Sequence, residues 1–136
     1  MKNLKINFSK QIISRTPTQK EIYQAVNILL AKKIPQQILS TTIIEFGVNY
    51  ISSQEIQKLN SKYRHLDKPT DVLSFPIYSN VSDIQQSPNH VNNLGDIFIC
   101  LPEAKKNAQD KKTTLNDEII FLILHGLKHL LGFHHR

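Results

Sequence analysis

The pattern of hydrophobic and polar positions predicts strands that alternate with helices. From Thr42 to Ile51, apolar residues alternate with polar ones, with the period of two that is typical of a half-buried strand. Short apolar runs over Lys5–Phe8, Asp71–Ile77 and Leu94–Leu101 indicate further strands, the first of them a short edge strand. The pattern therefore predicts a small mixed four-stranded sheet.

Capping residues predict the helices between these strands. Thr18 and Glu21 have the spacing of a capping box, in which each residue's side chain bonds the other's backbone N–H. Ser52 and Glu55 repeat the same spacing before the next helix. The expected helices cover residues 18–32 and 52–63, and Pro102 opens a shorter one.

The last helix, expected from Thr113 or Thr114, is apolar in almost every direction. Gly132 is expected to end it, because glycine adopts the left-handed conformation without a steric penalty. A helix that is apolar all round is typical of the middle of a fold. We therefore expect one α/β (α+β) domain over residues 1–136, with helices flanking the sheet and this C-terminal helix buried against it. The apolar positions are Ile119, Ile120, Phe121, Leu122, Ile123, Leu124, Leu127, Leu130 and Leu131.

The stretch from Tyr78 to Asn93 is polar, has no periodicity and is rich in Ser and Asn. Loops of this length in a domain are commonly functional or mobile. His90 within it is expected to be a solvent-exposed loop residue rather than a metal ligand.

Composition and charge narrow the range of partners. The 136 residues include 40% hydrophobic and 21% charged residues, an ordinary globular composition. No apolar run reaches the roughly 18 residues of a membrane span, so we expect a cytoplasmic protein without a membrane partner. The single cysteine, Cys100, agrees with a reducing compartment and is expected to serve packing. A net charge of +6 favours a polyanionic partner.

The strongest chemical signal is a pair of histidines near the end of the chain. His125 and His129 lie four residues apart, a spacing that places both imidazoles on one helix face, where they can share a metal ion. A turn at Gly132 can bring His135 to the same ion as a third ligand. Three imidazoles leave a fourth position for water, as in catalytic zinc sites. The alternative is that these are half-buried, hydrogen-bonded histidines without a metal.

The motif differs from that of the His-Glu-x-x-His metalloproteases. In that class the glutamate after the first histidine acts as general base. Gly126 occupies this position here, so the base is missing or is supplied by another group.

Three segments together resemble the YbeY family, bacterial zinc-dependent endoribonucleases that act in ribosomal RNA maturation. The stretch from His125 to His135 resembles the family signature His-Gly-x-x-His-Leu-x-Gly-aromatic-Asp-His. Leu59–Arg64 followed by Pro69–Pro76 resembles the family's central block, and 94–99 its next strand. The segments occur in the family's order from about residue 50 to the end of the chain.

The resemblance implies a function and a set of partners. It implies a zinc-dependent endoribonuclease of single-stranded RNA, acting in ribosomal RNA 3′-end maturation and ribosome quality control. One Zn²⁺ per chain would be bound by His125, His129 and His135. The partners would be ribosomal RNA and the small ribosomal subunit. His134 replaces the family's aspartate before the last ligand, and this makes His134 a rival for the third ligand position.

Arg64 lies in the segment that resembles the family's central block, and the resemblance implies that it is the catalytic residue of this site. A guanidinium holds phosphate oxygens with a planar fork, and phosphodiester cleavage gathers negative charge on those oxygens. Lys62, His65 and Lys68 could extend a groove that follows the RNA backbone. The alternative for Arg64 is a solvated side chain that is favourable at the C-terminus of a helix.

The carboxylates Glu118, Asp71 and Asp96 are expected to lie outside the ligand set. Glu118 shares an angular stripe with His125 and His129 but lies roughly 10 Å along the axis, so a capping or surface role is expected rather than that of general base. Asp71 and Asp96 are expected to be structural or to support the site without binding the metal.

The rival functions are a metalloprotease-like hydrolase and a noncatalytic ribosome-associated RNA-binding protein with structural zinc.

Overall fold

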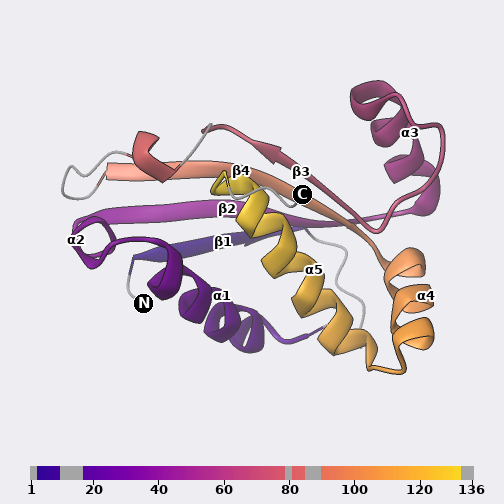
Figure 1. Ribbon diagram of the computed structural model, residues 1–136, viewed down its shortest axis with the longest axis horizontal. Coiled ribbons are helices and arrows are strands. Elements are labelled where there is room, and N and C mark those ends of the chain that lie inside the picture. The colour runs from indigo at the N-terminus through magenta and orange to yellow at the C-terminus, as the bar shows by residue number, and fades with distance from the viewer. Residues whose placement is uncertain (1–2, 10–16, 79–80, 85–89, 133–136) are drawn as a thin grey trace.

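A mixed sheet organises the fold, as the computed structural model shows (Figure 1). The structure describes residues 3–9, 17–78, 81–84 and 90–132. Neighbouring strands in the sheet have the order β1-β2-β4-β3. β1 is parallel to β2 and β2 to β4, whereas β3 is antiparallel to β4. The expected four-stranded mixed sheet is confirmed. The strands are β1 (Leu4–Phe8), β2 (Thr42–Ile51), β3 (Val72–Pro76) and β4 (His90–Cys100).

Two of the helices begin at the capping boxes that the sequence predicts, whereas the short helix over Gln36–Leu39 was not predicted. The Thr18 hydroxyl accepts from the backbone N–H of Glu21, and Ser52 and Glu55 repeat this arrangement. Both capping boxes are therefore confirmed. The helices are α1 (Gln19–Lys33), α2 (Gln36–Leu39), α3 (Ser53–Arg64), α4 (Leu101–Lys111) and α5 (Leu115–Leu130), with a 3-10 turn at Val81–Asp83. No helix in the described ranges is both long and apolar enough to cross a membrane.

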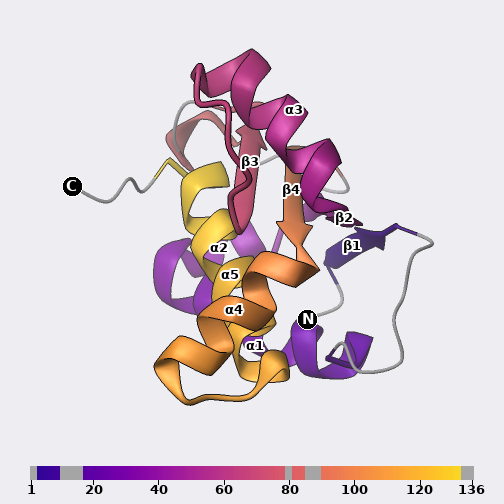
Figure 2. The same cartoon turned by 90° about the vertical axis from the view of Figure 1, so that its right-hand side faces the viewer.

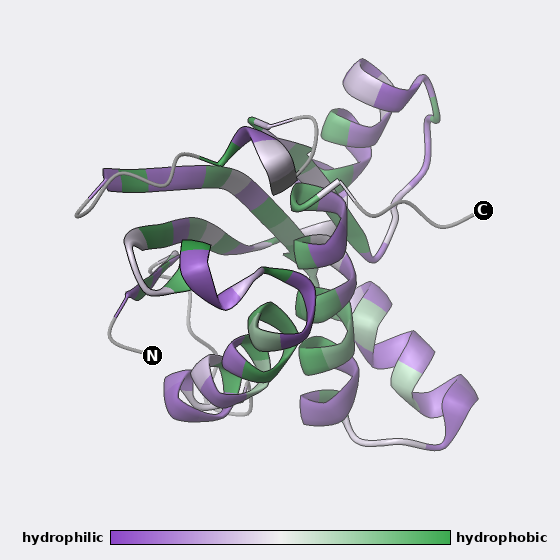
Figure 3. Cartoon of the chain, turned by 60° about the vertical axis from the view of Figure 1, so that its left-hand side comes forward, coloured by the Kyte–Doolittle hydropathy of each residue, from purple (hydrophilic) through white to green (hydrophobic). Residues whose placement is uncertain are grey.

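The main core lies between one face of the sheet and helices α1 and α5, which Figure 1 shows on the same side. Phe46 and Ile97 from the sheet and Ile119, Ile123 and Leu127 from α5 are at most 1% exposed. Figure 3 shows the alternation of hydrophobic and hydrophilic residues as bands along the strands. The predicted burial of the last helix is confirmed, although Phe121 remains 52% exposed.

Helix α3 covers part of the opposite face of the sheet, at the end near α4 (Figure 2). Ile56 of α3 packs in a small second cluster with Leu73 and Cys100. Phe75 and Phe98 complete this cluster from β3 and β4. Cys100 is fully buried, so its predicted packing role is confirmed.

The segment before Leu94 differs from the sequence-based prediction. β4 begins at His90, so residues 90–93 are strand rather than loop, and His90 pairs with Thr42 of β2. The prediction that His90 lies in a loop is therefore wrong. Asn92 is fully buried, where its amide donates to the Thr42 hydroxyl and accepts from the Tyr78 hydroxyl. Asparagine can occupy this strand because its partners satisfy it.

Candidate metal and phosphate site

Helix α5 positions the two histidines at its C-terminal end. It begins after Thr114, whose hydroxyl accepts from the backbone N–H of Asp117 at 3.0 Å. It ends near Gly132, which has a φ of 87°. The predicted start and end of this helix are confirmed, and His125 and His129 lie one turn apart on it.

The two imidazoles converge. The Nε2 atoms of His125 and His129 are 3.2 Å apart, and both side chains are half-buried. Two nitrogens bound to one tetrahedral zinc, at bond lengths near 2.05 Å, would be about 3.3 Å apart. The pair therefore fits two positions of a zinc ligand set.

The third predicted ligand, His135, and its rival His134 lie outside the described residues. Within the described ranges, no group of three His, Cys, Asp or Glu side chains could hold a metal ion. The proposed ligand set accordingly depends on the segment after Gly132.

Helix α5 approaches the sheet closely at Gly126, between the two histidines. A Cβ atom built there would lie 2.8 Å from Cγ2 of Ile97 and 3.0 Å from Oγ of Ser74. The Ser74 hydroxyl donates to the Gly126 carbonyl oxygen at 3.3 Å. The position that carries glutamate in the metalloprotease motif therefore faces β3 and β4 and has no room for a side chain.

The histidines and Arg64 line one cleft. Its volume is about 330 Å³, and one wall consists of the residues that lead into and form β3. The cleft thus brings together Arg64 and the two histidines, which the sequence separates widely. Its lining residues are Arg64, Thr70, Asp71, Val72, Leu73, Ser74, His125 and His129.

Local hydrogen bonds hold Arg64 at the end of α3. His65 adopts the left-handed conformation with a φ of 59°, and its backbone N–H donates to the Ser61 carbonyl oxygen. The buried Asn60 amide donates to the Lys68 carbonyl oxygen at 2.9 Å and so fixes the connection to β3. The guanidinium therefore extends from an anchored turn, although Arg64 itself is exposed.

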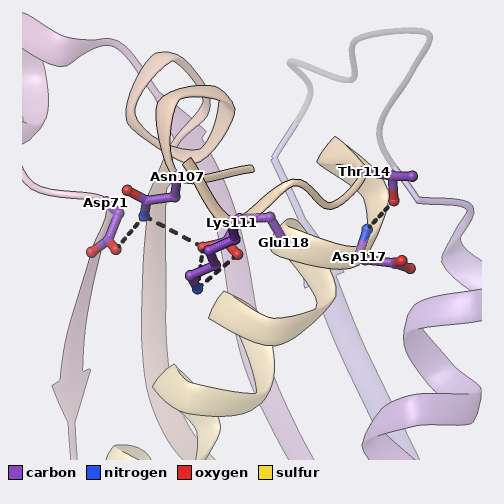
Figure 4. A network of polar contacts seen from close by, with 6 residues as sticks. All are labelled: Asp71, Asn107, Lys111, Thr114, Asp117 and Glu118. Atoms are coloured by element: carbon purple, nitrogen blue, oxygen red, sulfur yellow. Dashed lines mark hydrogen bonds and ion pairs between the residues drawn. The ribbon is translucent and has the colours of Figure 1, made fainter. Parts of the chain in front are cut away.

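A polar network behind the cleft links α4, α5 and the start of β3 (Figure 4). The Asn107 amide donates to Oδ2 of Asp71 at 2.8 Å and to Oε2 of Glu118 at 3.4 Å. Lys111 donates to Oε1 of Glu118 at 2.9 Å. Asp71, which lines the cleft, is therefore oriented by Asn107. The expectation that Glu118 has a capping or surface role is wrong: it is 2% exposed because α4 supplies its partners.

An aromatic residue connects this network to the histidines. The Phe121 ring stacks on the His125 ring, with 6.2 Å between centroids and 24° between planes. The Lys111 ammonium lies 4.2 Å from the Phe121 centroid. Phe121 is one of many apolar residues of this helix, and its position four residues before His125 is the signal in the sequence that indicates this contact. Asn107 and Lys111 lie on the face of α4 that also carries the buried Ala104 and Ala108, and nothing in the sequence shows that α5 packs against this face.

The remaining polar residues singled out in the sequence lie elsewhere. Asp96 is exposed, and its Oδ1 lies 3.5 Å from the amide nitrogen of Asn49 on β2. Neither Asp96 nor His90 lines the cleft. Lys62, His65 and Lys68 are exposed next to Arg64 but do not line the cleft either.

Comparison with known proteins gives one consistent family. The family model described as Endoribonuclease YbeY matches residues 4–136. The chain is 33% identical over 141 residues to the Endoribonuclease YbeY of Lactobacillus gasseri, covering 99% of this chain and 79% of the relative. It is 40% identical over 135 residues to that of Prochlorococcus marinus strain MIT 9215, covering 97% and 74%. The solution structure of a Thermotoga maritima protein, 23% identical, has a TM-score of 0.58 and covers 98% of this chain and 75% of that one, which supports the fold.

Proposed function

This chain belongs to the endoribonuclease YbeY family, and we propose that it cleaves single-stranded RNA in the cleft between α5 and β3 with the help of one zinc ion. The observation that carries the proposal is that Arg64, His125 and His129 line the same cleft. A phosphodiester and a metal are the two groups that this combination of side chains binds best.

Each residue has a role in this proposal. His125 and His129, with His135 as the third ligand, would hold the zinc. A zinc ion bound by three imidazoles supplies a hydrolytic nucleophile at neutral pH. Arg64 binds the non-bridging oxygens of the scissile phosphate and stabilises the charge that they gain in the transition state.

Groups just before β3 complete the cleft. The Thr70 hydroxyl lines it and lies 3.4 Å from Oδ1 of Asp71. Asp71 is held by Asn107 at 2.8 Å, so its carboxylate has a fixed direction. An oriented carboxylate beside the cationic groups can accept a proton during hydrolysis, and we assign Asp71 as the first group to test for that role.

The RNA is proposed to be ribosomal. In this proposal the protein acts in 3′-end maturation of ribosomal RNA and in ribosome quality control, with the small ribosomal subunit as its partner and the cytoplasm as its compartment. The net charge of +6 supports a polyanionic partner.

A metalloprotease-like activity is disfavoured, because Gly126 stands at the position of that class's glutamate and packs against Ile97 and Ser74, which leaves no room for a side chain.

Substitution of Arg64 tests the proposal. Arg64→Ala should abolish cleavage of single-stranded RNA while zinc content and far-UV circular dichroism stay unchanged, and Arg64→Lys should recover little activity because a point charge replaces a fork. Lys32→Ala is the matched control, since it removes one exposed cation from the distant helix α1.

The possible results separate the functions. Wild-type cleavage by Arg64→Ala would return Arg64 to the role of a surface cation. Zinc-loaded wild-type protein that binds RNA without cleaving it would support the noncatalytic binding protein instead. Full cleavage by metal-free His125→Ala protein would show that cleavage does not require the metal site.

A further inference from the structure

Tyr63, the residue before Arg64, exposes an aromatic ring to solvent. Its relative exposure is 54%, and it lies at the C-terminal end of α3. The ring packs edge-to-face on Phe75, with 5.1 Å between centroids and 73° between planes. Phe75 packs in the same manner on Phe98 at 5.6 Å. The Tyr63 ring is therefore supported from the sheet side while more than half of the residue remains accessible.

Packing alone does not account for this exposed ring. The small cluster under α3 is closed by Ile56, which is fully buried, and by Leu73 at 5% exposure. An aromatic residue contributes to such a core through the area that it buries, and Tyr63 leaves most of that area in water.

The surroundings of Tyr63 are basic. Residues 58–68 contain four Lys or Arg residues and one acidic residue, Asp67. The Lys62 ammonium lies 5.1 Å from the Tyr63 ring centroid. An open depression of about 420 Å³ beside Tyr63, which does not itself line it, is lined by Gln54, Gln57, Lys58, Ser61, Lys62 and Asp67. A ring beside cations that can follow a phosphate backbone is the combination found in sites for single-stranded nucleic acid.

We propose that Tyr63 is a platform on which an unpaired base of the RNA stacks, next to the phosphodiester bound by Arg64. Consecutive helical residues point in directions about 100° apart. Arg64 lines the cleft on one side of this turn while Tyr63 lies against Phe75, so the strand leaves the cleft over the end of α3. The Lys62 ammonium, which lies over the Tyr63 ring in the free protein, would move to an adjacent phosphate when the base stacks.

This inference rests on the proposed function and assigns its preference for single-stranded RNA to one residue. Stacking accepts every base, because each base has a π-face, but it requires the base to be unpaired. The platform therefore selects single-stranded over double-stranded RNA without selecting a sequence.

Kinetics of RNA cleavage give the first test. Tyr63→Ala should raise the KM for a short single-stranded oligoribonucleotide about 5- to 100-fold with little change in kcat, and Tyr63→Phe should restore the wild-type KM to within about twofold. Oligonucleotides that lack one base at successive positions should show one position where the wild-type protein loses affinity and Tyr63→Ala loses none. Ile28→Ala is the control, because Ile28 is 60% exposed on α1.

Fluorescence gives a direct readout of stacking. The chain contains no tryptophan, so Tyr63→Trp introduces a sole tryptophan at this position. Its emission should be quenched on mixing with the oligoribonucleotide and remain unquenched with inorganic polyphosphate. Ile28→Trp should show no quenching with either probe.

The outcomes distinguish the two proposals. Unchanged KM in Tyr63→Ala, or equal quenching of Tyr63→Trp and Ile28→Trp, would overturn the platform while RNA cleavage by the wild-type protein still stood. If the zinc-loaded wild-type protein neither bound nor cleaved single-stranded RNA, the proposed function would fail and the platform with it.

Discussion

The Nζ atom of Lys111 lies 2.9 Å from Oε1 of Glu118, a carboxylate side chain that is only 2% exposed. The same ammonium lies over the ring of Phe121, and that ring stacks on His125. The ion pair therefore joins α4 to the helix that carries the histidines. Removal of a partner from such a buried group costs more than the pair itself contributes.

We predict that Lys111→Met lowers the free energy of unfolding by about 1–3 kcal/mol, because it leaves the Glu118 carboxylate buried without its cation. Glu118→Gln should cost less, since an amide removes the buried charge. The double variant should be more stable than the sum of the single effects predicts. Urea unfolding measures all three, with Lys105→Met on the exposed side of α4 as control. Equal stability of Lys111→Met and the control would contradict this account.

Gly126→Ala is predicted to destabilise the protein by about 1–3 kcal/mol, although alanine favours a helix over glycine by about 1 kcal/mol. The reason is the short distance from the added methyl group to Ile97 and Ser74. Combination with Ile97→Ala should cost less than the two changes separately, since it removes the clashing γ-carbons. Thermal unfolding would decide, and a higher midpoint for Gly126→Ala would show that the helix can move away from the sheet.

Tyr50 gives a prediction at alkaline pH. Its hydroxyl is buried without a hydrogen-bond partner in the described part of the chain, and burial raises the pKa of Tyr50 to about 12. The unfolded chain releases this proton near pH 10, so the stabilising contribution is intact below pH 10 and is lost as the pH rises towards 12. The loss is at most about 1.4 kcal/mol per pH unit. Tyr50→Phe should reduce the slope of stability against pH in this range, and an unchanged slope would exclude Tyr50 as its source.

The third ligand of the proposed zinc site can be assigned by comparing two adjacent histidines. Gly132 has the positive φ that a chain reversal after α5 requires, and the interval from His129 to His135 matches the family motif. We therefore expect His135→Ala to lose more bound zinc than His134→Ala, measured by competition with a chromophoric chelator. The reverse order would assign the ligand to His134.

RNA binding should weaken steeply with salt, because each neutralised phosphate of a single strand adds about 0.7 to the slope of log affinity against log salt. Arg64→Ala should reduce the magnitude of this slope by about that amount. Lys32→Ala should leave it unchanged. Affinity that does not depend on salt would remove RNA as the substrate class.

Local signals in the sequence predicted most of the fold. Capping boxes at Thr18 and Ser52 and the period of two in β2 depend on neighbours along the chain, and the structure confirms each of them. The start of β4 was missed because Asn92 is polar, and its partners come from other segments. A polar strand residue whose partners are distant cannot be distinguished from a loop residue by pattern.

The features of the candidate site likewise fall into those that the sequence predicts and those that it does not. The convergence of His125 and His129 follows from helical spacing alone. The burial of Glu118 could not be foreseen, because a carboxylate in the first turn of a helix is favourable at the surface too, and only the packing of α4 against α5 supplies Lys111 and Asn107. The meeting of Arg64 with the histidines was implied only by the family resemblance.

The close approach of α5 to the sheet at Gly126 also restricts which substitutions this site can accept during evolution. A single substitution to glutamate would produce the protease-type motif in the sequence, but its side chain would have to displace Ile97 from the core beneath α5. A lineage could reach that chemistry only by first withdrawing the helix from the sheet, at the expense of the packing that holds His125 and His129 in place. The short distance between helix and sheet thus prevents a change from one hydrolase motif to the other, although the two motifs differ by one residue.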